Sequence, residues 1–256
     1  MTMPDFDNHP ADAPTMSPEM PNATNYYRWI VSQIAPYLGH HILDVGGGYG
    51  AHLAHILPER GNVTSIDLSE SGVRFMRERF QDFPNFQARH ADFRRQEVQD
   101  DLAAQRFDTI TCLNVLEHIE DDLAALQGMH AILAAQNGAV ILQVPAHQWL
   151  YGSLDSEAGH FRRYRAADLR RRLDQADFEI LRLYHFNSAG VVPWFINARI
   201  LKSALDAGRV NFQIRVFDRY IVPVMQRLES RISPPIGQSL MAIARARQPE
   251  QPVTGT

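Results

Sequence analysis

The chain has 256 residues, of which 45% are hydrophobic, and its formal net charge is −4. This length and composition allow one α/β domain with an ordinary core. Cys112 is the only cysteine, which excludes an intrachain disulfide. Neither a run of about twenty apolar residues nor the basic-then-apolar order of a signal peptide is present, so we expect a cytoplasmic protein without a membrane span.

The two parts of the chain differ in charge. Residues 1–156 carry 9 Lys and Arg against 20 Asp and Glu, whereas residues 157–256 carry 16 against 9, giving about −11 and +7. The basic second part fits an anionic substrate, a membrane surface or solvated helix faces.

The first predicted element is an amphipathic helix. Residues 1–22 are rich in Pro, Asp and Asn without periodicity and are expected to form a tail. From Asn25, apolar side chains recur at spacings of three and four, with Tyr26, Trp29 and Ile34 among them. This spacing predicts a helix that packs on a core.

Residues 41–50 form the motif that organises the rest of the chain. A short apolar run stops at Gly46, Gly48 and Gly50, a G-x-G-x-G pattern, and a helical pattern follows at residues 51–57. Strand, tight turn and helix are therefore expected, with the helix amides facing a nucleotide-like ligand. The third glycine comes one residue earlier than in the dinucleotide pattern, and Asp44 precedes the turn, which weakens a dehydrogenase interpretation.

Two further predicted strands end in aspartates. Residues 62–67 end at Asp67, about twenty residues after the glycines, where a carboxylate can accept hydrogen bonds from both ribose hydroxyls of an adenosine. A helix-capping role for Asp67 is the alternative. A third strand, beginning at Phe86, ends at Asp92 and Phe93.

The fourth and fifth predicted strands complete a parallel series. Asp108 begins an apolar strand that Asn114 ends, and Leu-Glu-His-Ile then leads into a helix capped by an acidic residue from 120–122. Residues 139–144 read as a buried fifth strand. Successive strand and helix units predict a parallel sheet with ligands at the carboxyl ends of its strands.

Together these motifs resemble those of class I S-adenosylmethionine (SAM)-dependent methyltransferases, over residues 25 to about 246. The motifs concerned are Gly46-Gly48-Gly50, Asp67, Asp92 and Asn114 to His118. The resemblance implies a Rossmann-like α/β fold, with a seven-stranded, mostly parallel sheet in the order 3-2-1-4-5-7-6 and helices on both faces. It also implies a methyltransferase domain at 23–246, with a helical insertion at about 187–235 before an antiparallel last strand. A C-terminal tail would follow at 247–256.

The resemblance implies SAM as the cofactor. In the family the glycine turn wraps the methionine part, an acidic residue and the next amide bind adenine, and a tyrosine of the first helix reaches the carboxylate or sulfonium region. The expected cofactor-binding residues are Tyr26, Tyr27, Asp44, Gly46, Gly47, Gly48, Gly50, Asp67, Leu68, Asp92, Phe93, Asn114 and Val115.

Residues 145–164, after the fifth strand, are dense in groups that bind or titrate, and long loops of this kind are commonly functional. Their Pro-Ala-His, Leu-Tyr-Gly, Leu-Asp and Gly-His-Phe-Arg-Arg-Tyr segments resemble one branch of bacterial methyltransferases. The functional interpretation places His147, Tyr151, Asp155 and His160 around the acceptor, with His160 as the preferred base, and makes His118, after the fourth strand, a further possible base. The catalytic candidates are His160, His118, His147 and Tyr151. Alternatively, His118 shapes the cofactor pocket, and Arg162, Arg163 and Tyr164 tie the loop to acidic groups.

The sequence thus predicts a SAM-dependent methyltransferase of small-molecule biosynthesis, acting on an oxygen or nitrogen of its acceptor by in-line displacement. No metal is expected, because the aspartate and asparagine trio of magnesium-dependent catechol-type enzymes is missing, and no nucleic acid, because no Asn-Pro-Pro-Tyr-type motif occurs. The aromatic, basic insertion could bury an apolar acceptor, contact a second subunit in a homodimer or touch a membrane peripherally. Two alternatives stay open: a methyltransferase of a membrane lipid or lipid-linked sugar, and a non-catalytic cofactor-binding subunit.

Overall fold

The computed structural model describes residues 20–201 and 207–248. The predicted tails lie outside these ranges except for residues 20–22 and 247–248. The strands are β1 (His41–Val45), β2 (Asn62–Asp67), β3 (Phe86–His90), β4 (Thr109–Leu113), β5 (Ala139–Pro145), β6 (Phe178–Phe186) and β7 (Ser239–Ala246). The α-helices are α1 (Thr24–Ile34), α2 (Leu53–Ile56), α3 (Glu70–Arg79), α4 (Gln96–Ala103), α5 (Asp122–Leu133), α6 (Ser153–Glu157), α7 (Ala166–Gln175), α8 (Val191–Phe195), α9 (Ala207–Val216) and α10 (Val222–Glu229). The shorter helical turns are η1 (Met20–Asn22), η2 (Ala35–Tyr37), η3 (Leu116–His118), η4 (Ala134–Gln136), η5 (Gln148–Leu150), η6 (Ser188–Gly190), and the π-helical η7 (Ile196–Leu201) and η8 (Phe217–Ile221).

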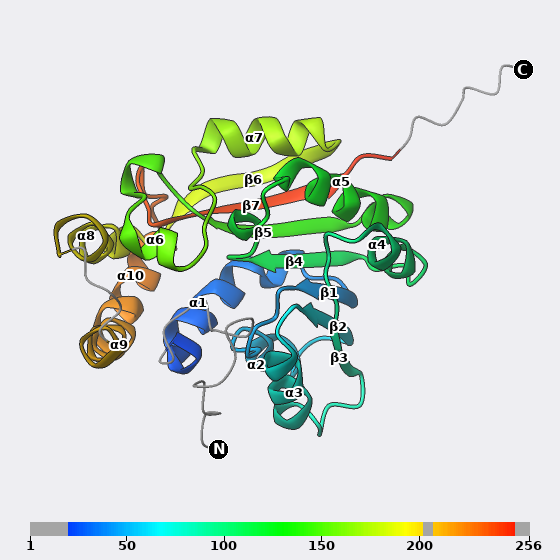
Figure 1. The fold of residues 1–256 in the computed structure, drawn as a ribbon, viewed down its shortest axis with the longest axis horizontal. Coiled ribbons are helices and arrows are strands. Elements are labelled where there is room, and N and C mark those ends of the chain that lie inside the picture. The colour runs from blue at the N-terminus through cyan, green and yellow to red at the C-terminus, as the bar shows by residue number, and fades with distance from the viewer. Residues whose placement is uncertain (1–19, 202–206, 249–256) are drawn as a thin grey trace, which may run out of the picture.

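The seven strands form one sheet in the order β3-β2-β1-β4-β5-β7-β6, which confirms the predicted order (Figure 1). β1 to β5 run parallel to one another, and β7 runs antiparallel between β5 and β6. Leu43 of β1 pairs with Thr64 of β2 and Ile110 of β4. The carboxyl ends of β1, β2 and β4 therefore meet at one edge, toward which the arrow of β4 points in Figure 1.

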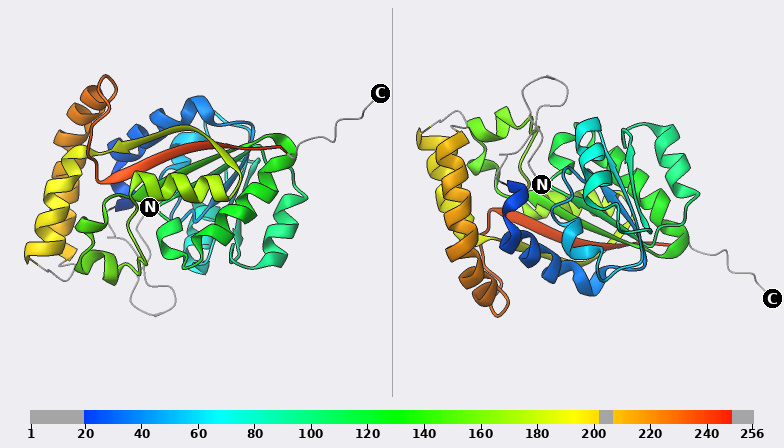
Figure 2. Two further views of the ribbon diagram at one scale, coloured as in Figure 1. Left: turned by 90° about the horizontal axis from the view of Figure 1, so that it is seen from above. Right: turned by 90° about the horizontal axis from the view of Figure 1, so that it is seen from below.

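A hydrophobic core lies on each face of the sheet. Ile42 and Leu43 are both fully buried, yet they enter opposite cores, because successive side chains of a strand point to opposite faces. The helices α4, α5 and α7 cover the core that contains Leu43, and α1, α2 and α3 cover the other (Figure 2). Covering both faces explains why β4 and β5 are almost continuously buried.

Local side chains set several helix ends. The Ser69 hydroxyl accepts a hydrogen bond from Gly72 N at the start of α3, and Asp121 accepts from Ala124 N at the start of α5. Of the three acidic residues considered before α5, the cap is thus Asp121. The predicted helix at 51–57 was too long, because the chain is still turning after Gly50, whose φ is +66°, and Pro58 has no amide to continue the helix.

Between β6 and β7 the chain forms a helical arm, by which we mean α8, η7, α9, η8 and α10. The arm stands across the end of the sheet where the strand carboxyl ends lie (Figure 2). Its Asp218 carboxylate accepts hydrogen bonds from the backbone amides of Asn25 and Tyr26, which fastens the arm to the start of α1. Among the described helices, none has the length and apolar character needed to cross a membrane.

Candidate functional site

The glycine loop (residues 46–50) uses its glycines for different purposes. Gly46, Gly48 and Gly50 have φ values of +77°, +56° and +66°, a region that side chains disfavour. A Cβ at Gly46 would lie 2.2 Å from Val115, and one at Gly50 would lie 2.5 Å from Phe80, so packing requires both glycines. A Cβ at Gly48 would meet no atom within 4 Å. Gly48 therefore offers bare backbone to open space, as a ligand-binding turn requires.

Asp44 lies beneath this loop. Its side chain is fully buried, and it accepts hydrogen bonds from Ser65 Oγ and Thr111 Oγ1, both at 2.8 Å, while His52 Nε2 lies 2.7 Å away. Burial alone would raise the pKa of Asp44, but the charge and hydrogen bond of His52 outweigh it and lower the pKa. The expectation of direct cofactor contact does not fit this position, because the carboxylate is enclosed. Asp44 ties β1, β2 and β4 together under the loop, and His52 is a partner that sequence reasoning missed.

Asp67 joins the second strand to the same loop. Its carboxylate accepts hydrogen bonds from Gly48 N and Ser69 N, both at 2.7 Å. Burial raises the pKa of Asp67, and those two backbone bonds oppose the shift. The neighbouring Leu68 is 56% exposed. The loop and the end of β2 are therefore one hydrogen-bonded unit.

The two predicted residues after β3, Asp92 and Phe93, lie in different surroundings. Asp92 is partly exposed and pairs with Arg94 through two bonds of 2.8 Å, and hydrogen bonds from Arg94 lower its pKa. The Phe93 ring is buried in the core beside α4 and α5. Only the backbone of Phe93 remains for a ligand.

The end of β4 approaches the glycine loop from the other side. Asn114 is exposed with φ +56°, and its backbone N–H donates a hydrogen bond to the backbone carbonyl oxygen of Gln143 at 2.8 Å. Gln143 Nε2 also donates to the Tyr26 hydroxyl at 2.9 Å, which draws α1 onto β5. Burial raises the pKa of Tyr26 to about 12, and the Tyr27 ring lies 6.5 Å from that of His52. The structure therefore brings the predicted residues of α1, β1, β2 and β4 to one edge of the sheet.

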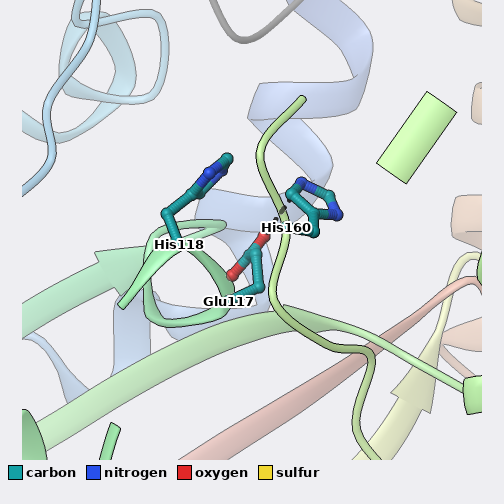
Figure 3. A group of neighbouring side chains, drawn as sticks. All are labelled: Glu117, His118 and His160. Carbon is teal, nitrogen blue, oxygen red and sulfur yellow. Dashed lines mark ion pairs between the residues drawn. The ribbon is translucent and has the colours of Figure 1, made fainter. Parts of the chain in front are cut away.

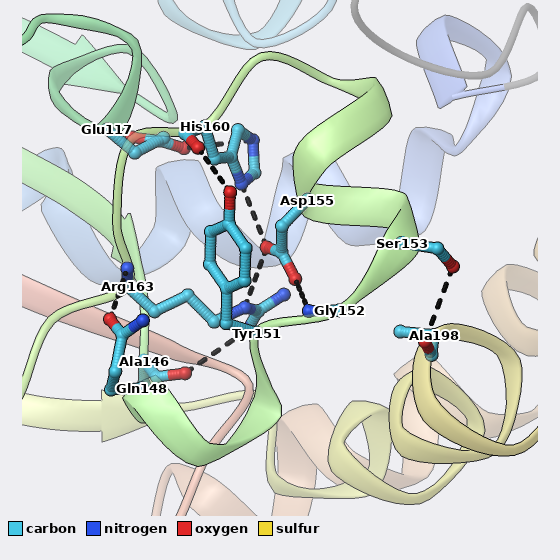
Figure 4. Close-up of polar contacts among 10 residues, drawn as sticks. All are labelled: Glu117, Ala146, Gln148, Tyr151, Gly152, Ser153, Asp155, His160, Arg163 and Ala198. Atoms are coloured by element: carbon cyan, nitrogen blue, oxygen red, sulfur yellow. Dashed lines mark hydrogen bonds and ion pairs between the residues drawn. The ribbon is translucent and has the colours of Figure 1, made fainter. Parts of the chain in front are cut away.

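A buried network of ion pairs and hydrogen bonds around Asp155 holds the loop after β5 (residues 146–164) in place (Figure 4). Asp155 is fully buried and binds His160 Nδ1 at 2.9 Å, Arg163 Nε at 2.7 Å and Gly152 N at 2.9 Å. Tyr151 donates its hydroxyl to the His160 carbonyl at 2.7 Å. The segment was expected to be a long loop, but it contains two short helices, η5 and α6. Asp155 and Tyr151 thus position His160.

The anchoring role that was weighed for the last loop residues is also present. Arg162 Nη1 lies 2.9 Å from Asp122, and the Tyr164 hydroxyl donates to the same carboxylate at 2.9 Å. Arg163 also donates to Ala146 O at 3.1 Å. These bonds tie the loop to α5 and to the end of β5.

His118, His160 and Glu117 form one group above the end of β4 (Figure 3). The two imidazole centroids are 4.7 Å apart, and His160 Nε2 lies 4.0 Å from Glu117 Oε1. Glu117 is 1% exposed, and among the residues that the structure describes neither of its carboxylate oxygens has a hydrogen-bond partner. Burial raises the pKa of Glu117 to about 8 and lowers that of His118 to about 4. Sequence reasoning did not single out Glu117, since only its place in the Leu-Glu-His-Ile motif marked it.

His147, the remaining catalytic candidate, has other neighbours. Its ring stacks on that of His185 at 4.8 Å and lies 5.7 Å from that of Trp149. Within the described residues no contact joins it to His118 or His160.

Comparisons with known proteins agree with this geometry. A family model described as a methyltransferase domain matches residues 22–183. A ubiquinone biosynthesis O-methyltransferase of Actinobacillus pleuropneumoniae is 26% identical over 180 residues, spanning 62% of this chain and 75% of that protein. A SAM-dependent methyltransferase from Archaeoglobus fulgidus superposes with a TM-score of 0.57 at 16% identity, over 87% of this chain and 94% of that one.

The fold also hosts other chemistry. The [4+2]-cyclase SpnF superposes with a TM-score of 0.59 at 17% identity, over 87% of this chain and 81% of that one. Likeness at such identity shows the fold alone, and the reaction must be argued from the site. The family match covers more than half of the chain and carries the assignment: the chain belongs to the methyltransferase-domain family, has its Rossmann-like fold and is a SAM-dependent methyltransferase.

Proposed function

We propose that this enzyme methylates an oxygen or nitrogen of a small-molecule acceptor bound beside the loop after β5. The observation that carries the proposal is the His160 imidazole, whose Nδ1 is fixed by the buried Asp155 next to the end of β4. The name of the Actinobacillus relative, an O-methyltransferase, supports a hydroxyl acceptor.

The glycine loop fits the cofactor. Gly48 leaves open space where a Cβ would stand, and Asp67 and Asn114 flank it at the ends of β2 and β4. In our proposal Asp67 binds the ribose, the partly exposed Asp92 and the Phe93 amide bind adenine, and the loop backbone receives the methionine part. When bound, SAM supplies an electrophilic sulfonium methyl group that the acceptor attacks, with the carbon–sulfur bond electrons remaining on sulfur.

The chain's own contribution is alignment and proton removal. Asp155 accepts a hydrogen bond from Nδ1 of His160. The Nε2 lone pair of the neutral imidazole therefore points away from Asp155 and can take the acceptor's proton. The buried carboxylate then stabilises the imidazolium that forms, as in hydrolase triads. The His118 ring, whose centroid lies 4.7 Å from that of His160, borders the space in which we place the acceptor.

The test compares two histidine variants. His160→Ala should lower turnover about a hundredfold or more, as loss of a general base does, while SAM affinity changes little. His130→Ala is the matched control, because His130 lies on α5 and contacts Arg247 O. Methyl transfer from labelled SAM to hydroxylated aromatic compounds, both water-soluble and prenylated, is the assay. Full turnover by His160→Ala would remove His160 from the mechanism.

A second candidate function, methylation of a membrane-borne lipid acceptor, is favoured by the surface of the helical arm. Exposed apolar side chains recur there at every fourth residue, and exposed arginines recur beside them. The apolar stripe consists of Phe212, Val216, Tyr220, Val224 and Leu228, and the basic stripe of Arg215, Arg219 and Arg227; the exposed Arg231 and Ile232 follow just after α10. An apolar face beside a basic one is typical of helices that lie on anionic bilayers.

The arm also touches the loop that we assign to the acceptor. The Arg163 guanidinium lies 4.6 Å from the Trp194 ring centroid, and Ser153 Oγ donates to Ala198 O at 3.3 Å. A docked arm would bring that loop to the lipid surface. Co-sedimentation should show binding to vesicles that contain phosphatidylglycerol, and weaker binding by Val224→Asp. Failure to bind, or a dimer in which the stripe is buried, would contradict the lipid candidate.

A further inference from the structure

We propose that Glu117, His118 and His160 bind one divalent transition-metal cation of the Zn²⁺ class. Each residue offers one ligand atom, and these atoms all lie within 4.8 Å of one another. Figure 3 shows the three side chains converging from η3 and from the loop after β5. The inference deepens the proposed function and rests on it for the role of the cation, although not for its binding.

Glu117 supplies the strongest reason. Its side chain is 1% exposed, and both oxygens lack a hydrogen-bond partner in the part of the chain that the structure describes. Leaving a buried carboxyl group unsatisfied is costly, so such groups are normally paired or coordinate metals. The hydrogen bonds of the buried Arg163 go to Asp155 and to Ala146 O, and its charge lowers the pKa of Glu117 by less than burial raises it. A cation between the carboxylate and the imidazoles would satisfy it.

Another group orients the His160 imidazole. Asp155 holds Nδ1 of His160 at 2.9 Å, which leaves Nε2 on the side of Glu117, at 4.0 Å. His118 Nδ1 lies beside Gly159, 4.0 Å from the position that a Cβ on Gly159 would occupy. Metal-binding histidines usually donate their second nitrogen to a carboxylate or backbone carbonyl, as His160 does to Asp155. His160 is therefore supported as a metal ligand would be.

The donor set selects the class of cation. Two imidazole nitrogens and one carboxylate oxygen suit Zn²⁺ or Co²⁺ better than Mg²⁺ or Ca²⁺. Tetrahedral bonds of about 2.1 Å would place ligand atoms about 3.4 Å apart, so modest side-chain rotation would close the group. Three protein ligands leave a fourth position for water or for the acceptor's oxygen.

An acceptor hydroxyl at that fourth position would lose its proton readily, as metal-bound water does. The proton would go to solvent, and the oxygen would remain bound as an alkoxide. In that case His160 acts as a ligand, and the cation takes over the task that the proposed function gives to the free imidazole.

The test measures metal binding directly. The full chain is freed of metal with a chelator and titrated with Co²⁺, followed by visible absorption, and with Zn²⁺, followed by calorimetry. We expect one equivalent to bind, and a loss of affinity of roughly a hundredfold in Glu117→Gln and His118→Gln. His130→Gln should bind like the wild type, because its imidazole lies outside the group. Circular dichroism melting checks that each variant is folded.

Two results would overturn the inference: no stoichiometric binding by the wild type, or binding that both ligand variants retain. Methyl transfer by chelator-treated protein at the full rate would likewise overturn the catalytic role of the cation while the proposed function stands. Tight metal binding without any methyl transfer would instead contradict the proposed function and leave the site intact.

Discussion

Replacing Gly48 by alanine separates ligand binding from stability. The added Cβ would meet no atom within 4 Å, so the only stability cost is the left-handed backbone at φ +56°. That cost is about 1–2 kcal/mol, which corresponds to a melting temperature lower by about 2–8 °C for a chain of this size. The methyl group would nevertheless occupy the open space that we assign to SAM. We expect SAM to bind at least roughly tenfold more weakly, a loss of about 1.4 kcal/mol.

Calorimetry with SAM and thermal unfolding are measured on the same preparations, with two matched variants. Gly159→Ala imposes a similar strain, since Gly159 has φ +75° and its added Cβ would lie 4.0 Å from His118, but it should keep the SAM affinity. Gly50→Ala should be less stable than both, because its Cβ would lie 2.5 Å from Phe80. If Gly48→Ala lowers the melting temperature yet binds SAM as tightly as the wild type, the ligand does not approach the loop at this point.

Three further changes test the supports of the site. Asp67→Asn should weaken SAM binding by roughly tenfold to a hundredfold in calorimetry, since charge-assisted hydrogen bonds contribute about 1.5–3 kcal/mol each, and unchanged affinity would refute the ribose placement. Asp44→Asn should lower the free energy of unfolding by about 1–3 kcal/mol at pH 7. Because the pKa of Asp44 is lowered in the folded state, that contribution is present above the unfolded value near 3.8 and is lost as the pH falls further, so urea unfolding should show the gap closing in acid, and a constant gap would contradict the assignment. Asp218→Ala should cost about 1 kcal/mol, as loss of an N-terminal cap does, and speed proteolysis of the helical arm, whereas unaltered proteolysis would show that the arm is fastened elsewhere.

The resemblance supplied the strand order, because the motifs at the strand ends match those of the methyltransferase family. Gly46 and Asn114 each follow a buried strand and Asp67 ends one, and parallel strands bring their carboxyl ends to one edge. The spacing of apolar side chains placed α1, and the resemblance placed the antiparallel β7. The length of α2 was not predictable, since apolar spacing continues through residues at which the backbone is still turning.

The partners of the buried carboxylates could not be predicted. Asp44 is bound by Ser65 and Thr111, which are 21 and 67 positions away in sequence, so only the folded sheet brings them together. Glu117 is buried because the loop carrying His160 folds over it. A carboxylate in a loop motif gives no sign of whether it will be enclosed.

The helical arm was predictable in part. A helical insertion at about 187–235 was predicted, and the arm lies within it. The π-helical turn η8, which links α9 to α10, left no sequence signal that we used. Tertiary packing of Val222 into the core beside α1 shows which face of the arm is inward.

The most direct test of the account is a crystal structure of the chain with S-adenosylhomocysteine. We expect the homocysteine part of the ligand to lie against Gly48, its ribose at Asp67 and its adenine at Asp92. Its sulfur should face His118 and His160. A complex in which the ligand lies away from the glycine loop, or in which its sulfur faces away from the loop after β5, would contradict the account.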